Sequence, residues 1–314
     1  MSAFFRSLVA ATIALTFVVI VVGAYVRLSD AGLGCPDWPL CYGRTLPAEI
    51  SEAGALAKAW KEMGHRYLAG ALGILILLQA ALSWKNRRSR ATATAILALV
   101  IFQATLGMWT VTMLLKPAIV TAHLLGGMTT LALLVLLYLQ EGRYSPAPQT
   151  QALRPVAALS LAALAVQIAL GGWVSANYAA LACPDLPGCL GQALPPMDFA
   201  NAFHVLRELG HTGGGELLPR EALTAIHWTH RAFALVLVAV VGWAALKASG
   251  IAALRPLAAL TGILLLLQFS LGVANVALGL PLTLAAAHNA GAALLLVSLV
   301  VLNFFAFRGL RPFQ

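Results

Sequence analysis

Residues 256–307 read PLAALTGILLLLQFSLGVANVALGLPLTLAAAHNAGAALLLVSLVVLNFFAF and contain no aspartate, glutamate, lysine or arginine. One membrane-spanning helix needs about 20 mostly apolar residues at a rise of about 1.5 Å each. The stretch is therefore long enough for two spans, and Gly279, Leu280 and Pro281 supply a turn between them. It predicts an all-α integral membrane protein, because a membrane-embedded backbone must satisfy its hydrogen bonds internally.

The rest of the chain follows the same pattern. Of its 314 residues, 61% are hydrophobic and 10% are charged, whereas soluble domains have roughly 25% charged residues. We predict eight spans, at about 8–27, 65–84, 92–114, 118–140, 154–175, 227–247, 256–276 and 283–306. We interpret the first as a retained helix, because its apolar run is longer than that of a secretory signal and no small-residue cleavage site follows it.

The distribution of positive charge predicts the topology. The net charge is +9, but the basic residues cluster on one side of the eight-span arrangement, so they indicate the cytoplasmic face rather than nucleic-acid binding. Only Glu141 of the eleven acidic residues is expected on that side, and both termini are expected there too. The basic residues on this side are Arg6, Lys85, Arg87, Arg88, Arg90, Arg143, Arg154, Lys247, Arg255, Arg308 and Arg311.

The chain also repeats itself, which is its strongest organisational feature. Matches 165 positions apart are His65-Arg66 with His230-Arg231, Gln103 with Gln268, Gly107 with Gly272, and His123 with His288. Each copy has four spans, so both copies enter the membrane in the same direction. We therefore predict two pseudo-symmetric four-helix bundles in a parallel tandem repeat, with an N-terminal half at 1–145 and a C-terminal half at 146–314.

The cysteines repeat at a shorter offset. Cys35 and Cys41 recur 148 positions later as Cys183 and Cys189, so the second copy carries a 17-residue insertion before His230. All four lie in the two large loops, on the outer face of the predicted topology. Two disulfides are expected there, and pairing within each loop is the simplest of three connectivities. They are either structural staples or redox groups near an active site.

Each copy carries two histidines at similar shallow depth, namely His65 with His123 and His230 with His288. Ionisable groups inside spans are costly and tend to be functional, although a lone histidine is more often a hydrogen-bonded core residue. Zinc prefers four ligands, and no cysteine or carboxylate accompanies these histidines within the bundle. Two imidazoles from facing helices suit a haem iron instead.

Other residues around the sites fit the same interpretation. Small residues after the histidines, such as Gly126 and Gly291, leave room for a flat macrocycle or simply allow close helix packing. Arg66 and Arg231 follow their histidines at the outer edge. Their guanidinium groups either pair with haem propionates or extend to the membrane surface.

The two copies differ in their ionisable residues. Glu62 lies one helical turn before His65, and its counterpart in the second copy is His227. Arg27 and Asp30 likewise correspond to Ser175 and Tyr178, as the cysteine offset aligns them. A carboxylate at a partly desolvated edge can act as an acid or base, or can stabilise a helix N-terminus. We infer that the first copy transforms a substrate and the second holds a permanent cofactor.

Taken together, these residues resemble the haem A synthases over essentially the whole chain. The segments that carry the resemblance are 62–66 (EMGHR), 107–111 (GMWTV), His123, 226–231 (IHWTHR) and the paired Cys-Pro-Asp loops. Family members oxidise the C8 methyl group of haem O to a formyl group, giving haem A for terminal oxidases, with oxygen thought to come from water.

The resemblance implies a role for each site residue. His230 and His288 would ligate a haem b cofactor, His65 and His123 would hold the substrate haem, and Glu62 would be catalytic. It further implies the bacterial cytoplasmic membrane, with haem O synthase and terminal oxidase assembly factors as partners. A homo-oligomer is compatible with the sequence. His204 and His211, in the second outer loop, are expected to be solvated.

Two other classes compete with this interpretation. A di-haem b-type cytochrome that passes electrons from quinol would need the same four histidines and eight helices. A transporter would use the interface between the repeats, although inverted halves need an odd number of spans per copy. The presence of Glu62 in only one copy favours the enzyme, because two purely electron-carrying haems need no such difference.

Overall fold

The computed structural model describes residues 3–47, 54–142 and 144–310, and within them it contains helices and no strand. Eight helices are long and apolar enough to cross a membrane, which confirms the predicted number. They are α1 (Ala3–Leu28), α2 (Ala55–Lys85), α3 (Arg90–Thr112), α4 (Pro117–Gln140), α6 (Arg154–Ala176), α8 (Arg220–Ser249), α9 (Arg255–Ala277) and α10 (Leu282–Arg308). Three short elements join them: α5 (Pro148–Gln151), α7 (Phe199–Ala202) and the 3₁₀ turn η1 (Ala252–Leu254).

Two helices begin earlier than the apolar pattern predicts. The pattern places the starts of the second and sixth spans at 65 and 227, whereas α2 begins at Ala55 and α8 at Arg220. The added turns of α2 carry Lys58, Lys61 and Glu62, which end an apolar run but are good helix formers. Hydropathy therefore marks the part of a helix that lies in lipid and misses the turns that extend beyond it.

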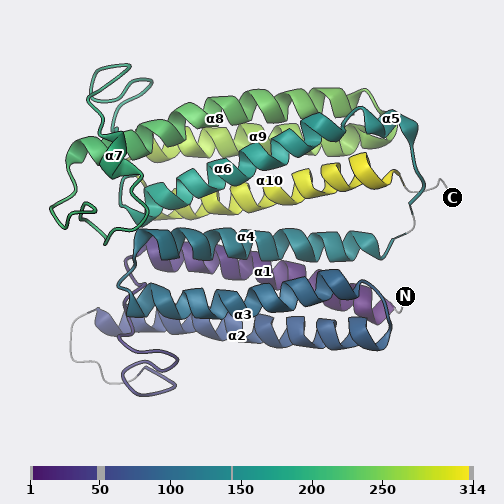
Figure 1. Ribbon diagram of the computed structural model, residues 1–314, viewed down its shortest axis with the longest axis horizontal. Coiled ribbons are helices and arrows are strands. Elements are labelled where there is room, and N and C mark those ends of the chain that lie inside the picture. Colours follow the sequence, from purple (N-terminus) through teal and green to yellow (C-terminus); the bar gives the residue numbers. More distant parts are fainter. Residues whose placement is uncertain (1–2, 48–53, 143, 311–314) are drawn as a thin grey trace.

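The helices form two groups of four, seen one above the other in Figure 1. Helices α1 to α4 pack in a ring, and α6, α8, α9 and α10 pack in a second ring. The rings meet where α10 contacts α1 and α4 and where α4 contacts α6. A continuous apolar core crosses this boundary, with Leu131 of α4 and Leu295 and Leu299 of α10 fully buried. Large apolar side chains such as Ile74 and Leu246 face outward, as lipid requires.

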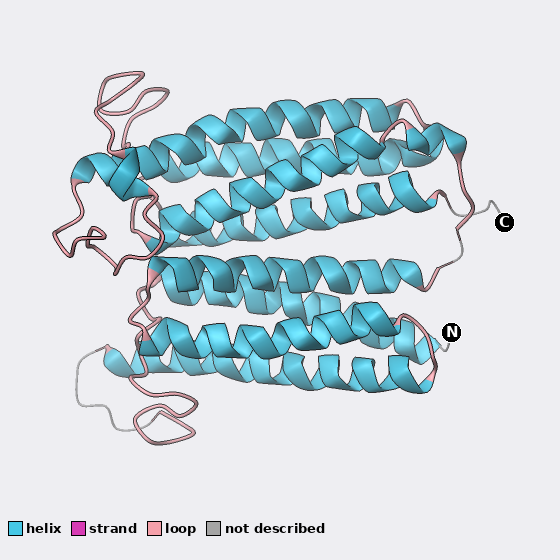
Figure 2. Ribbon diagram, in the orientation of Figure 1, coloured by secondary structure: helices cyan, strands magenta, loops and turns pink. Residues whose placement is uncertain are grey.

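The large loops lie together at one end of the bundle. Figures 1 and 2 show the loop after α1 and the loop after α6 at the same end, while α1 begins and α10 ends at the opposite end. Arg143 and Arg311 are outside the described residues. The Gly-rich part of the insertion forms a turn in which Thr212 donates its backbone N–H to Glu216 and Gly215 donates to Thr212.

Backbone conformations recur at the two offsets that the sequence displays. Asp30 and Tyr178 both have positive φ, at 50° and 55°, and Leu115 and Leu280 do so at 57° and 63°. Residues with side chains seldom adopt this left-handed region. The chain therefore leaves α1 and α6 through the same turn, and it enters α4 and α10 through a second shared turn.

Candidate functional site

A cavity of about 1740 Å³ lies among the helices and is lined by residues of both rings. Its volume exceeds the roughly 300–1,000 Å³ of a typical small-molecule pocket. All four of the predicted histidines line it, and so does Glu62. The structure thus brings the predicted residues of each half to the wall of one continuous space that is large enough for two bulky ligands.

Each histidine ring rests on a glycine of a neighbouring helix. The glycines are Gly23 for His65, Gly107 for His123, Gly171 for His230, and Gly272 for His288. A methyl group on the glycine would lie 2.8 Å from the ring in the first pair, 3.4 Å in the second, and 3.1 Å in the third and fourth. Glycine is used where another group must approach the backbone this closely. The repeat preserves all four contacts, so a comparison of the two copies could have found them.

The histidines of each half lie close enough to interact electrostatically, His65 with His123 and His230 with His288. The buried Nδ1 atoms of His65, His123 and His288 have no hydrogen-bond partner among the described residues. Nor do the described residues include a group of three or more histidine, cysteine, aspartate or glutamate side chains that could hold a metal ion. Two imidazoles in each half, both on the wall of one cavity, fit an iron porphyrin, which needs only two axial ligands from the protein.

Gln167 of α6 is a site residue that the sequence interpretation missed. Its amide nitrogen lies 3.1 Å from the His230 carbonyl oxygen and 3.2 Å from the His230 Nδ1 atom. The corresponding residue of the first half is Val19, which also lines the cavity but offers no polar group. A polar side chain within a span, at a position where the other copy has an apolar residue, is the signal that could have identified it.

Two further glutamines stand beside the other pair of equivalent histidines. Gln103 donates to the His123 carbonyl oxygen at 3.1 Å, and Gln268 lies 3.3 Å from the His288 Nε2 atom. Their side chains occupy the space next to the small residues that follow those histidines. A methyl group on Gly126 would overlap Gln103, and one on Gly291 would overlap Gln268. These glycines therefore make room for glutamine side chains, which favours the close-packing alternative at these two positions.

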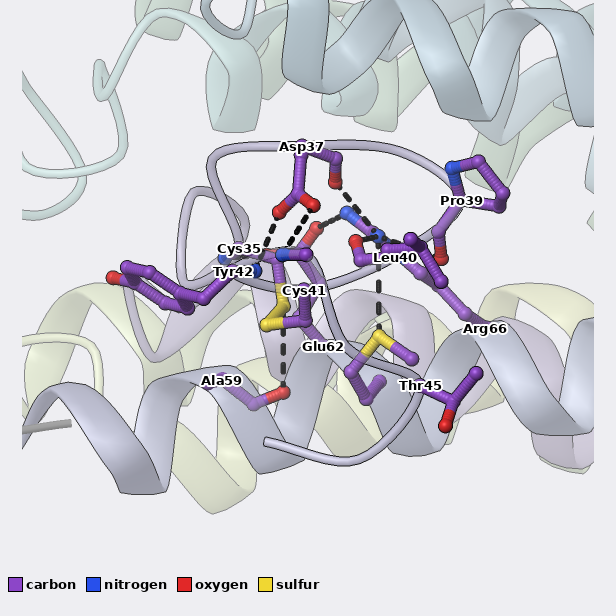
Figure 3. The surroundings of a disulfide bond; sticks show 12 residues. Cys35, Asp37, Pro39, Leu40, Cys41, Tyr42, Thr45, Ala59, Glu62 and Arg66 are labelled. Atoms are coloured by element: carbon purple, nitrogen blue, oxygen red, sulfur yellow. Dashed lines mark hydrogen bonds and ion pairs between the residues drawn. A yellow bond between two sulfur atoms is a disulfide. The ribbon is translucent and has the colours of Figure 1, made fainter. Parts of the chain in front are cut away.

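The loop between α1 and α2 folds over the start of α2 (Figure 3). Disulfides join Cys35 to Cys41, and Cys183 to Cys189 in the second loop. The backbone N–H of Cys35 donates to a carboxylate oxygen of Glu62 at 2.8 Å. The other carboxylate oxygen accepts from Arg66, with which Glu62 forms an ion pair. Glu62 is 4% exposed, so a buried carboxylate sits directly beneath the disulfide.

Arg66 fastens this loop to the helix. Its Nη1 atom donates to the carbonyl oxygens of Asp37 at 2.9 Å and Leu40 at 2.7 Å, as Figure 3 shows. Arg66 also lines the cavity. Its planar group, with several donors, suits simultaneous contacts of this kind. A propionate contact for Arg66 stays a prediction.

The second outer loop is held in the same way, with one chemical difference. Arg231 donates to the carbonyl oxygens of Asp185 and Pro187, both at 3.0 Å. The backbone N–H of Cys183 donates to the Nδ1 atom of His227 at 3.2 Å. His227 is 4% exposed, as Glu62 is. A carboxylate in one half and an imidazole in the other therefore accept from equivalent cysteine N–H groups.

The other residues that distinguish the copies meet at the boundary between the rings. Arg27 donates to the carbonyl oxygen of Ser175 at 2.8 Å and stacks 3.9 Å above the ring of Tyr178. The Tyr178 hydroxyl donates to Asp30 at 3.1 Å. All four line the cavity. His204 and His211 are exposed, as predicted, and are not part of this site.

Comparison with known proteins places these features in context. A family model described as COX15-CtaA, cytochrome oxidase assembly protein, matches residues 6–300. The chain is 44% identical over 310 residues to a heme A synthase of Shewanella oneidensis, covering 94% of each chain. A heme A synthase of Halalkalibacterium halodurans is 28% identical over 69% of this chain and 73% of its own length. A protein of Natronomonas pharaonis named protoheme IX farnesyltransferase 1 is 32% identical over 42% of this chain and 27% of its own length.

Proposed function

This chain belongs to the COX15-CtaA family of cytochrome oxidase assembly proteins, and we propose that it is a haem A synthase. It is a multi-pass membrane oxidoreductase that acts on haem O. The reaction converts the C8 methyl group of the porphyrin into the formyl group of haem A. The observation that carries the assignment is Glu62, a buried carboxylate at the cavity wall of one half, where the other half has His227.

The two halves bind different haems. His65 and His123 hold the iron of the substrate haem in the N-terminal half, 1–145. His230 and His288 hold haem b in the C-terminal half, 146–314, and Gln167 fixes the position of the His230 ring. A haem b held by these residues would supply a one-electron carrier for the oxidation. The glycine that each histidine ring contacts allows that ring to lie close against the neighbouring helix.

Glu62 acts on protons at the substrate. Oxidising a methyl group to a formyl group with oxygen from water releases protons as electrons leave, so a base is needed beside the methyl group. The carboxylate of Glu62 lines the cavity and is oriented by the Cys35 N–H and by Arg66. These donors hold it in one position. The imidazole of His227 carries no such negative charge, so the second half stores a cofactor without transforming it.

The surroundings of the enzyme follow from the same proposal. It lies in the bacterial cytoplasmic membrane, with both termini in the cytoplasm and the cysteine loops on the outer face. A haem O synthase supplies the substrate, and the product passes to terminal oxidase assembly factors. The match to a protein named protoheme IX farnesyltransferase 1 supports the first of these partners. We propose a homo-oligomer as well.

The test is Glu62→Ala in cells that co-express a haem O synthase, with pigments extracted and identified by chromatography and mass. The wild type is expected to accumulate haem A. Glu62→Ala is expected to accumulate haem O and no haem A, while it retains haem b. The control is Glu216→Ala, which removes an exposed carboxylate from the second outer loop and leaves the cavity unchanged.

Three results would contradict the proposal or its assignment of Glu62. If wild-type cells contained haem b alone, the protein would instead be a di-haem electron carrier. If purified wild-type protein had no haem absorbance, the paired histidines would not bind haem, and a transporter would become the better interpretation. Haem A formed equally by Glu62→Ala and by the control would remove Glu62 from the mechanism.

A further inference from the structure

The cavity extends further along the helices in the first half than in the second. Its wall reaches Leu77 of α2, twelve residues beyond His65. In α8 its wall reaches Val238, eight residues beyond His230. At about 1.5 Å per residue these depths are about 18 Å and about 12 Å. The first half thus has about one more helical turn of accessible depth below its histidines.

The extension lies between α2 and α3, where the first half has three small residues, Gly70, Gly73 and Ala104. All three line the cavity, and Gly70 and Ala104 are also exposed. We call them the α2–α3 gap. A methyl group on Gly70 or Gly73 would meet no atom within 4 Å. These glycines therefore do not serve close helix packing, which is the usual reason for small residues in membrane helices.

The second half has larger side chains at the corresponding positions. At the histidine offset of 165, the counterparts of the α2–α3 gap are Leu235, Val238 and Phe269, and all three line the cavity. Each replaces a hydrogen atom or methyl group by a branched or aromatic side chain. The two halves hold their histidines in the same way and differ here in the volume left beside them.

An unpaired polar group lies at the upper end of the α2–α3 gap. Gln103 precedes Ala104 on α3, lines the cavity and is 8% exposed. Its Oε1 atom, like that of the equivalent Gln268 in the second half, is buried and has no hydrogen-bond partner among the described residues. Buried polar atoms are nearly always paired. A ligand with a polar group near the histidines and a long apolar part below them would fit this arrangement.

We propose that the α2–α3 gap holds the farnesyl-derived hydrocarbon chain of haem O and makes the first half selective for a haem with a long tail. Leu235 and Phe269 occupy part of the corresponding space of the second half, which therefore takes haem without a tail. Haem O differs from protohaem in carrying this chain, and the burial of a long hydrocarbon chain is strongly favourable. The inference rests on the proposed function, because it assigns haem O to the first half.

The test transplants the residues of one half into the other. Purified protein that retains its haem b is titrated with haem O and, separately, with protohaem, and each Kd is read from the absorbance change. In the double variant Gly70→Leu, Ala104→Phe, the Kd for haem O is expected to rise about tenfold or more, while that for protohaem changes little. The absorbance of the retained haem b reports that the variant has folded.

The matched controls lie outside the cavity on the same two helices. Ala71→Val and Ala98→Ile also introduce the residue of the second half, at exposed positions that do not line the cavity. Neither is expected to change either Kd. The reverse variant, Leu235→Gly with Phe269→Ala, is expected to carry haem O in place of part of its haem b when purified from cells that make haem O.

Two outcomes would overturn the tail assignment. In one, Gly70→Leu, Ala104→Phe binds haem O as tightly as the controls do. In the other, it loses affinity for haem O and protohaem equally, which would mean that the gap accommodates the macrocycle. Failure of the proposed function is distinguishable, because it appears as absence of haem A from wild-type cells. The affinity measurement requires no turnover.

Discussion

Four histidines of this protein lie against helical glycines, and the distance from the ring to a methyl group on the glycine ranges from 2.8 Å to 3.4 Å. Real Cβ atoms almost never come within 3.0 Å of another heavy atom, and a methyl group on Gly23 would lie 2.8 Å from the His65 ring. On Gly107 it would lie 3.4 Å from the His123 ring, which is ordinary contact. A methyl group added to the neighbouring glycine would therefore crowd the His65 ring more than the His123 ring.

This difference gives a graded prediction at single residues. Gly23→Ala forces the His65 ring to move, and overpacking of this kind costs about 1–3 kcal/mol. We expect haem O affinity to fall by about tenfold or more, with little change for Gly107→Ala. The measurement is the Kd for haem O of each purified variant. Gly242→Ala is the control for the effect of replacing a helical glycine by alanine, because a methyl group there meets no atom within 4 Å. Equal effects of Gly23→Ala and Gly107→Ala would contradict the packing explanation.

Some of the site's residues can be predicted from sequence and others cannot. The histidines recur at a fixed offset, so the repeat alone identifies them. Gln167 is polar where the equivalent residue of the first half, Val19, is apolar, so a comparison of the two copies can identify it. The contact between the Cys35 N–H and Glu62 joins residues 27 positions apart through a loop. Neither the hydropathy pattern nor the repeat predicts how a loop folds. The contact between Cys35 and Glu62 is therefore visible only in the structure.

In each disulfide loop one carboxylate accepts two backbone N–H groups of the same loop. In the second loop, Asp185 accepts the backbone N–H groups of Leu190 at 2.6 Å and Gly191 at 2.8 Å. In the first loop, Asp37 accepts those of Tyr42 and Gly43 at 2.6 Å and 2.9 Å. The Gly191 N–H contributes most to holding the pKa of Asp185 below its usual range. Ionised aspartate therefore stabilises the loop.

The sign of the pH dependence follows from that direction. Because the pKa of Asp185 is lower in the folded loop, the stabilisation is complete above the ordinary aspartate pKa of about 3.9 and is lost as the pH falls through the lowered value. We expect the hydrogen-exchange protection of the Leu190 and Gly191 amides to decrease over that acidic window. In Asp185→Asn the protection should be weak at every pH. Protection that persists in Asp185→Asn would show that the carboxylate does not hold the loop.

Helices were predictable as elements, but their ends were not. Uncharged runs of the required length identify all eight spans, since few other structures tolerate them. The outer turns of α2 and α8 are polar, and they are helical because the disulfide loops and the rest of each bundle pack against them. The short helix α7 rests on an aspartate cap at Asp198, which accepts the Asn201 N–H at 3.1 Å. Such a brief local signal is indistinguishable from a turn in the sequence.

At the scale of the whole molecule, the two rings share one cavity and are joined at its outer end. Arg27 contacts Ser175 and Asp30 contacts Tyr178, and each of these pairs consists of one position and its own counterpart 148 residues later. Residues that touch their own counterparts lie where the two copies meet. Both proposed haem sites thus open onto a common boundary, which suits electron transfer between a transformed substrate and a retained cofactor.

The central claim is that the two histidine pairs have unequal roles, and the haem content of variants tests it most directly. Proteins with His65→Ala and with His230→Ala are purified from cells that make haem O, and their pigments are identified by mass. We predict that His65→Ala retains haem b and forms no haem A, because only the substrate site is lost. His230→Ala is predicted to lose haem b itself. Loss of haem b from His65→Ala together with its retention by His230→Ala would contradict the account and reverse the assignment of the halves.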